Sequence, residues 1–400
     1  MISNFLVRYR NVTILIVLSS VLGPVRSVLL ARILTINDFG TYSLALTVIG
    51  SLYPLLMFGQ QRGIIRFFNK NDVNQYDWIK PIVALTSIAM LSGFLLINLI
   101  SWFYDTEIFF IYYCLLALFC SIITELLAFI VISKGEHEIG LIIQRLIRVI
   151  ITAFVICFFF FKNSDLTLLF FIFGSIHLFY GFTIYKYVTN KVEIGMKMLP
   201  RSAHKEGLYF FVLDIVFISN TYGINFIIGA LLSIQHLGAL YALFIILRVY
   251  EAFIQATDLV VMPSARSLDQ KGIFVIILKN FIIGLILSIL FLTLGEFLIS
   301  TLYYGKFDSH SQLIPYICIL GWLKIMDIIP SSTIGGMSNT KILKRYAFFN
   351  IALSGIFLPS SIYFIYNYEL IGAVISLVFL TLVRLMVGFG FLLKAFRFVK

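Results

Sequence analysis

Residues 108–132 read IFFIYYCLLALFCSIITELLAFIVI and hold one charged side chain, Glu125. A helix of about 20 apolar residues crosses the roughly 30 Å hydrocarbon core of a bilayer, so this run predicts a membrane-spanning helix. The 400 residues contain about twelve such runs. Because no water inside a membrane can bond to an exposed backbone, each run must form a helix. The sequence therefore predicts an all-α integral membrane protein with about 12 transmembrane helices.

The composition agrees with this fold class. Hydrophobic residues make up 60% of the chain and charged residues 12%, which is far from the balance of soluble domains. The predicted spans are 10–31, 39–60, 79–101, 108–132, 139–161, 166–188, 205–232, 236–262, 273–300, 311–333, 346–366 and 370–393. No connection exceeds about 25 residues, so no soluble catalytic domain fits between them. We therefore expect that the protein is not an enzyme.

The basic residues predict the orientation in the membrane. The formal charge is +11, and 21 Lys and Arg lie in connections on the side of the N-terminus. The other side holds three, which are Arg32, Lys162 and Lys306. By the positive-inside rule, both termini are cytoplasmic. No Lys/Arg stripe with interleaved aromatic residues is present, so we expect no nucleic-acid partner.

The cysteines predict neither a cofactor nor a metal site. All four lie in apolar runs, at positions 114, 120, 157 and 318. These spacings match neither a disulfide framework nor a zinc site. We expect no cofactor and no metal ion.

An internal repeat divides the chain near its midpoint. Residues 29–40 read LLARILTINDFG, and residues 227–238 read IIGALLSIQHLG, at an offset of 198. The matched positions include Leu34 with Leu232, Thr35 with Ser233, Ile36 with Ile234 and Gly40 with Gly238. Chance similarity between two apolar helix ends is the alternative interpretation. Duplication predicts two six-helix bundles of equal orientation, 1–198 and 199–400, with a central cavity between them.

Two longer segments resemble a known family. The run ARILTINDFGTYSLALTVIG, followed by FGQQRGIIRFF, is similar to the opening of the polysaccharide repeat-unit flippases. These are the O-antigen or Wzx-type members of the multidrug/oligosaccharidyl-lipid/polysaccharide exporter superfamily. The segments LGALYALFIILRVYEAF and VVMPSARSL resemble the seventh and eighth helices of the same family. Together the motifs cover about 80 residues, and the resemblance implies that the two six-helix bundles form a V.

The resemblance implies a function and a set of partners. Such a flippase moves an undecaprenyl-pyrophosphate-linked oligosaccharide from the cytoplasmic to the periplasmic leaflet of the bacterial inner membrane. This transport serves the biosynthesis of O-antigen, lipopolysaccharide or a related polysaccharide. It works by alternating access among membrane lipids, with a proton or sodium ion as a potential coupling ion. The resemblance also implies contact with the polysaccharide polymerase and chain-length machinery.

Charges at hydrocarbon depth are the candidate functional residues. A charge at the bilayer centre costs roughly 2.5–3.5 kcal/mol on insertion scales, so it usually faces a bundle interior or a wet cavity. Guanidinium groups there suit an anionic pyrophosphate. The substrate-binding candidates are Arg26, Arg145, Arg148, Arg248 and Arg384. Six basic and six acidic residues remain inside the predicted spans, which departs from the strongly cationic cavity of the family.

Three acids are candidates for ion coupling, because a carboxyl group inside a membrane can exchange a proton. They are Asp214, Glu125 and Glu251. Structural pairing is the alternative role for several of these charges. Glu125 suits Arg145 or Arg148 on the neighbouring span, and Arg248 lies three residues from Glu251.

The charges of the last three spans raise the question of pairing again. Lys324 and Asp327 have the spacing of a pair within one helix, which is the favoured interpretation. Arg384 has no acid within a turn, so it needs a partner on another helix or a hydrated cavity.

Two other functions remain open from the sequence. A multidrug exporter of the same superfamily would need unpaired acids in its cavity. A membrane-embedded polysaccharide polymerase or glycosyltransferase would need a long outer loop with catalytic acids. The longest outer connection, 301–310, carries only Asp308 and Lys306.

Overall fold

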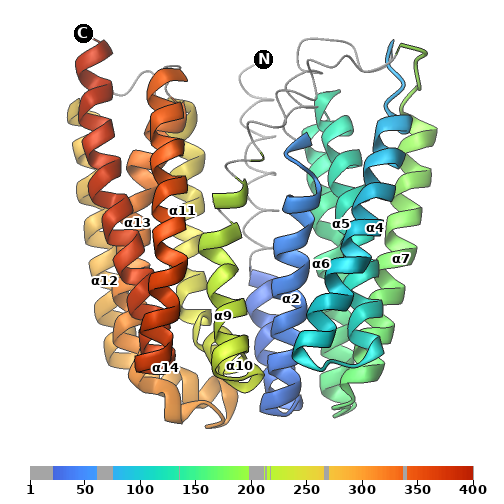
Figure 1. Ribbon diagram of the computed structural model, residues 1–400, viewed down its shortest axis with the longest axis horizontal. Helices are drawn as coiled ribbons and strands as arrows, with labels where there is room; N and C mark the ends of the chain where they lie inside the picture. Colours follow the sequence, from blue (N-terminus) through green and yellow to red (C-terminus); the bar gives the residue numbers. More distant parts are fainter. Residues whose placement is uncertain are drawn as a thin grey trace. The chain divides into compact units, whose positions relative to one another are not determined.

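The computed structural model describes residues 21–60, 75–134, 136–197, 211, 214–216, 218–264, 270–336 and 340–399. The chain divides into two compact units, Met1–Ile218 and Ser219–Lys400. Figure 1 draws the helices of the first unit from blue to green and those of the second from yellow to red. The predicted domain boundary between residues 198 and 199 lies outside the described residues.

The first unit is built around one central helix. Its helices are α2 (Ile36–Leu56), α4 (Ile79–Tyr104), α5 (Ile108–Ser133), α6 (His137–Phe160) and α7 (Leu166–Lys191). Residues 21–33 are also helical and form the described part of the first predicted span. Helix α5 packs against α2, α4, α6 and α7, and most of its side chains are buried. Of its polar residues, Tyr113 and Thr124 are buried and Glu125 is half-buried.

A small backbone clamp ties the start of α4 to the segment after α7. Tyr76 and Lys197 form a parallel β-bridge, and the Gly195 N–H donates to the Tyr76 carbonyl at 3.0 Å. A Cβ atom on Gly195 would lie 2.1 Å from the carbonyl carbon of Gln75, so only glycine permits this approach. The indole of Trp78, 1% exposed, donates to the segment after α7 at 3.2 Å. Nothing in the sequence predicted this clamp.

Asp77 joins the clamp to the first turn of α4. Its Oδ1 accepts a hydrogen bond from the Lys80 N–H at 3.2 Å, and its Oδ2 lies 2.9 Å from Lys80 Nζ. The hydrogen bond from the Lys80 ammonium holds the pKa of Asp77 below its ordinary value. The charged carboxylate thus satisfies a backbone donor at the helix start.

The second unit also has one central helix. Its elements are α9 (Gly223–Leu231), α10 (Ile234–Leu243), α11 (Ile245–Ser264), α12 (Gln270–Tyr303), η2 (Asp308–Leu313), α13 (Ile314–Gly336) and α14 (Thr340–Val399). Helix α13 packs against α11, α12 and α14. Helix α13 is therefore the central helix of the second unit, as α5 is of the first.

Helix α14 consists of two arms joined at Glu369, whose backbone is non-helical with φ 50° and ψ −132°. A Cβ atom on Gly372 would lie 2.0 Å from the carbonyl oxygen of Phe364. In a straight helix these residues would be about 12 Å apart, so the chain folds back on itself. The arms correspond to the predicted spans 346–366 and 370–393.

The predicted span 236–262 is broken rather than continuous. Helices α10 and α11 meet at Phe244 with a bend of 51°. The Tyr303 hydroxyl donates a hydrogen bond to the Ala242 carbonyl at 3.0 Å. A side chain of α12 therefore bonds to a backbone carbonyl of α10 close to the bend. Insertion of a side chain into the ladder is a known cause of helix bending. The bonding group comes from α12, so the local sequence carries no sign of the bend.

The repeated turn has the same local structure in both units. Thr35 precedes α2 with an extended backbone, and its hydroxyl accepts from the Asp38 N–H at 3.1 Å. Ser233 precedes α10 in the same way, and its hydroxyl accepts from the His236 N–H at 3.3 Å. Both are N-cap residues, which satisfy a free donor of the first helical turn. The two matched sequences thus begin a helix with the same N-cap hydrogen bond.

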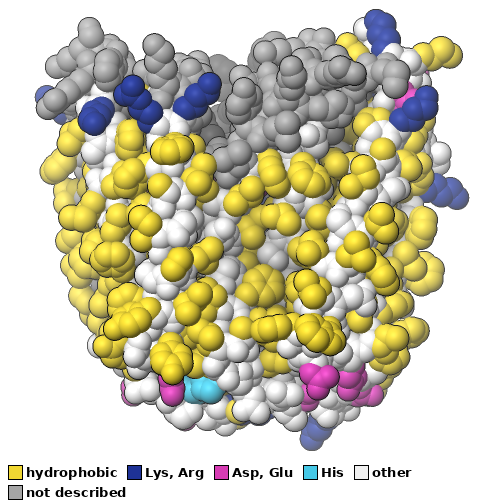
Figure 2. Space-filling view, viewed as in Figure 1, with side chains coloured by type: hydrophobic (Ala, Val, Ile, Leu, Met, Phe, Trp, Pro, Cys, Tyr) yellow, Lys and Arg dark blue, Asp and Glu magenta, His cyan; other side chains and the backbone are white. Residues whose placement is uncertain are grey.

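The surface is that of a chain surrounded by lipid. Nine described helices are long and apolar enough to cross a membrane, and the bent pair of α10 and α11 makes a tenth. Large apolar side chains are exposed along α4 and α12, including Trp102 at 80% and Phe274 at 65%. Figure 2 shows hydrophobic side chains over most of the described surface in this view. The predicted all-α integral membrane fold is confirmed.

Candidate functional site

Glu125 is the centre of the polar group in the first unit. It lies on the central helix α5, and the charges of Arg145 and Arg148 on α6 both act on it. Tyr53 on α2 and Gln144 on α6 lie within hydrogen-bonding reach of its carboxylate. The structure therefore brings together three predicted site residues from two helices. One carboxylate faces two guanidinium groups in this group.

Two further candidates of the first unit lie elsewhere in it. Arg26 is close enough to His177 on α7 for their charges to interact. His177 is buried, and its Nδ1 is 2.7 Å from the Phe173 carbonyl oxygen, as befits a core histidine. Asp214 is 5% exposed. Its role in ion coupling, like that of Arg26 in substrate binding, stays a prediction.

Arg248 and Glu251 on α11 form an ion pair within one helix. The Arg248 Nη1 and Glu251 Oε2 atoms are 2.9 Å apart, and the side chains are 49% and 31% exposed. Pairing at this spacing was the structural alternative for these two residues. The pair is observed, so Arg248 and Glu251 each have a charged partner on the same helix.

Arg384 has its ion-pair partner on another helix. This agrees with the sequence, in which no acidic residue lies within one helical turn of Arg384. Its Nη2 lies 3.1 Å from Asp327 Oδ2 on the central helix α13, with side chains 30% and 10% exposed. The direct ion pair of Asp327 is with Arg384 of α14, and the charge of Lys324, its favoured partner from the sequence, also acts on this acid. Lys324 is nevertheless close enough to Glu251, Arg248, Arg384 and Asp327 for their charges to interact.

These five residues form one charged group on three helices of the second unit. It contains three bases and two acids, contributed by α11, α13 and α14. The other acids of this unit's spans lie elsewhere. Asp258 accepts a hydrogen bond from Ser332, and Glu296 is exposed. Each described charged group, around Glu125 and around Asp327, thus has one more base than acid.

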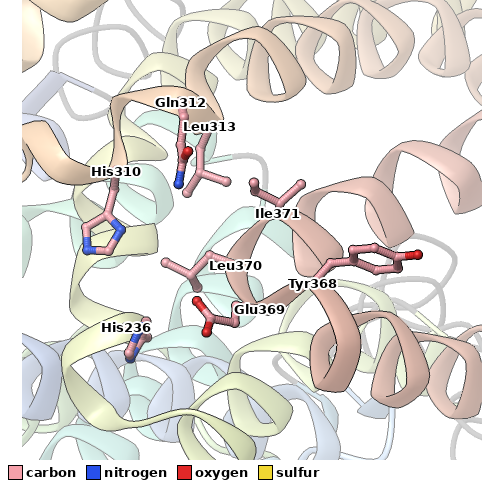
Figure 3. Close-up of a pocket in the computed structure, with 8 residues that line it drawn as sticks. All are labelled: His236, His310, Gln312, Leu313, Tyr368, Glu369, Leu370 and Ile371. Carbon is pink, nitrogen blue, oxygen red and sulfur yellow. The ribbon is translucent and has the colours of Figure 1, made fainter.

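A second polar site was missed by the sequence reasoning. His236 on α10, His310 on η2 and Glu369 at the turn of α14 line a cavity of about 50 Å³ (Figure 3). The signal in the sequence was weak. His236 lies in the repeated turn, where the first copy has Asp38, but neither His310 nor Glu369 has a motif around it.

Comparisons with known proteins establish the fold. No protein-family model and no curated protein sequence matches this chain. Solved structures do match. An inward-facing multidrug resistance MATE family transporter of the MOP superfamily aligns with a TM-score of 0.68 and 12% identity, over 95% of this chain and 94% of that one.

Two other solved structures support the same fold. The MATE multidrug transporter DinF-BH has a TM-score of 0.66 and 13% identity, over 96% of this chain and 93% of that one. A MOP superfamily transporter from Pyrococcus furiosus has a TM-score of 0.61 and 13% identity, over 97% and 93%. The chain is therefore a multi-pass membrane protein with the fold of MATE family transporters.

Proposed function

We propose that this protein is a transporter, not an enzyme, and that it moves an undecaprenyl-pyrophosphate-linked oligosaccharide from the cytoplasmic to the periplasmic leaflet. In the proposed cycle, cationic groups bind the pyrophosphate while the lipid tail stays in the bilayer. Alternating access then exposes the sugars to the other side. The product is O-antigen or a related polysaccharide of the bacterial inner membrane pathway.

The surplus of arginine around Glu125 carries the proposal. Two guanidinium groups, those of Arg145 and Arg148 on α6, act on the single carboxylate of Glu125. Charges at hydrocarbon depth usually face a bundle interior or a wet cavity. The oxygens of a pyrophosphate suit the planar donors of such arginines. The five-residue group around Asp327 has the same surplus.

Ion coupling completes the proposed cycle. Asp214, Glu125 and Glu251 are the acids that we propose for exchange of a proton or sodium ion. Glu125 has the strongest support, because uptake of a proton there would release both nearby arginines from its charge. Such an acid links the charge of the substrate site to the ion gradient.

Export of cationic drugs is the second candidate function. It is favoured by the structural neighbours, two of which are described as multidrug transporters. The Pyrococcus furiosus protein is described as having a binding pocket of reverse polarity that suggests a different function. Polarity is therefore the feature that separates the two candidates. The surplus of bases in both described charged groups favours an anionic substrate.

A vesicle assay separates these functions. The purified full chain is reconstituted into liposomes with fluorescent undecaprenyl-pyrophosphate-linked oligosaccharide, and transfer between leaflets is measured by quenching. We expect the wild type to transfer the lipid between leaflets. The double variant R145Q/R148Q should transfer it about tenfold more slowly or worse, because one hydrogen bond to a charged group contributes about 1.5–3 kcal/mol. The control R345Q removes an exposed arginine at the start of α14 and should retain transfer.

Three results would contradict the proposal. Equal transfer by R145Q/R148Q would separate these arginines from the substrate. Uptake of a cationic rhodamine without lipid transfer would identify a drug exporter. Sugar chains that lengthen without changing leaflet would identify a polymerase.

A further inference from the structure

The turn of α14 places a glutamate where the backbone favours glycine. Glu369 has φ 50° and ψ −132°, outside the helical region that its neighbours adopt. A non-glycine residue in such a conformation costs on the order of 1–3 kcal/mol. Glycine would make the same reversal without this cost. The presence of glutamate at this position therefore indicates that its side chain has a function in addition to forming the turn.

That side chain lies at the mouth of the polar cavity. Figure 3 shows the Glu369 carboxylate on the side of the turn that faces His236 and His310, whereas the Tyr368 ring points away. The cavity of about 50 Å³ is also lined by Gln312. It has room for a few water molecules and supplies polar partners for them. The carboxylate thus shares a wet site with two imidazoles.

The two imidazoles leave ring nitrogens available. Their ring centroids are 6.1 Å apart at an interplanar angle of 64°. Nδ1 of His236 is 2.7 Å from the Ser233 hydroxyl. Within the described part of the chain, Nε2 of His236 and both ring nitrogens of His310 have no hydrogen-bond partner. Proton acceptors and a carboxylate therefore surround the same water-sized space.

The other charges near the cavity are few. Among the described residues, the groups whose charges act on His310 are His236 and Glu369. Asp308, the first residue of η2, accepts a hydrogen bond from Ser300 at 3.1 Å and lies against Gly305. Lys306 precedes η2, and α12 ends with the uncharged Tyr303. The charge state of the cavity therefore depends mainly on the two histidines and the glutamate.

We propose that His236, His310 and Glu369 form a proton-binding site that fastens the turn of α14 to α10 and η2. One proton from water binds to the imidazole pair, and the resulting imidazolium attracts the Glu369 carboxylate. The net charge of the three groups changes from −1 to 0. Two imidazolium charges this close repel one another, so the site accepts one proton more readily than two. This site is separate from the arginine groups and does not depend on which substrate is carried.

The fastened form depends on pH. It requires a charged imidazole and a charged carboxylate at the same time. Burial and the charge of His236 lower the pKa of His310 from its ordinary value, so this imidazole takes up its proton only in acidic solution. The turn is therefore held most firmly in acidic solution.

Hydrogen–deuterium exchange of the full chain in nanodiscs tests the proposal. Exchange in peptides covering 366–372 is compared at pH 5.5 and 7.5, with EDTA present and with correction for intrinsic rates. We expect about 1.5- to 5-fold slower exchange at pH 5.5, the effect of a partly exposed ion pair. H236Q and H310Q should each reduce the effect, and E369Q should abolish it. Y368F, which changes a neighbouring lining residue, should retain it.

A second variant separates proton binding from turn formation. E369G relieves the unfavourable backbone and should raise the unfolding temperature, yet it should lose the pH dependence. If E369G and E369Q kept the pH dependence of the wild type, Glu369 would be a turn residue only and the proposal would fail. A pH effect that appeared only after added Zn²⁺ would also overturn it, because the imidazoles would then be metal ligands.

Discussion

The ion pair between Arg384 and Asp327 illustrates what a single residue reveals in a sequence. An arginine at mid-span with no acid within a turn has to find a partner elsewhere, and this requirement was predictable. The identity of the partner was not, because Asp327 lies 57 positions away on α13. The nearer candidate, Lys324, shares a helix with Asp327 but does not form the ion pair. Packing between helices decided between the two bases.

Loss of the Asp327 carboxylate should destabilise the protein strongly. D327N leaves the mostly buried guanidinium of Arg384 without a counter-ion, which costs about 3 kcal/mol. Thermal unfolding in detergent, followed by circular dichroism, measures this loss. The matched control is E136Q, which breaks an exposed pair with Lys191 outside the predicted spans and should cost less than about 1 kcal/mol.

A double variant provides the internal check on this prediction. D327N/R384Q removes both charges and should be more stable than the sum of the two single changes. If D327N were no less stable than E136Q, the buried character of the pair between Asp327 and Arg384 would be refuted.

At the scale of elements, hydropathy predicted where helices lie but not how they are joined. Helices α4, α5, α6 and α7 begin within a few residues of the predicted spans. The clamp between Tyr76 and Lys197 was not foreseen, because its backbone bonds join segments more than 100 positions apart. The bend between α10 and α11 was missed for the same reason. In both cases a group distant in sequence provides the bond.

The clamp should depend on the missing side chain of Gly195. G195A places a methyl group 2.1 Å from the Gln75 backbone, which the β-bridge cannot accommodate. Hydrogen exchange at residues 75–77 and 195–197 should become about tenfold faster, the equivalent of one lost hydrogen bond of about 1–1.5 kcal/mol. G355A is the control, because a Cβ atom there would have nothing within 4 Å. Equal exchange in wild type and G195A would exclude the clamp.

At the scale of the whole molecule, charge distribution predicts orientation. In the first unit, Lys134 follows α5 at one end and Lys162 follows α6 at the other. In the second unit, Lys344 lies in the first turns of α14 and Lys306 lies beyond the end of α12. The positive-inside rule places Lys134 and Lys344 in the cytoplasm.

Labelling of single cysteines tests this orientation. In a variant whose four native cysteines are replaced by serine, K162C and K306C should react with a membrane-impermeant maleimide on intact cells. K134C and K344C should react only after permeabilisation. The reverse pattern would invert the topology and with it the proposed direction of transport.

The sequence by itself determined the fold class, the spans and the duplicated helix start, because apolar runs and N-caps are properties of neighbouring residues. It also identified most of the buried charges, since a charge among apolar residues is visible without a structure. Only the tertiary structure decided which charges meet: Glu125 with two arginines of α6, Asp327 with Arg384, and Glu369 with two histidines. These groups join residues from different helices, and packing between helices is not encoded by any single stretch of the chain.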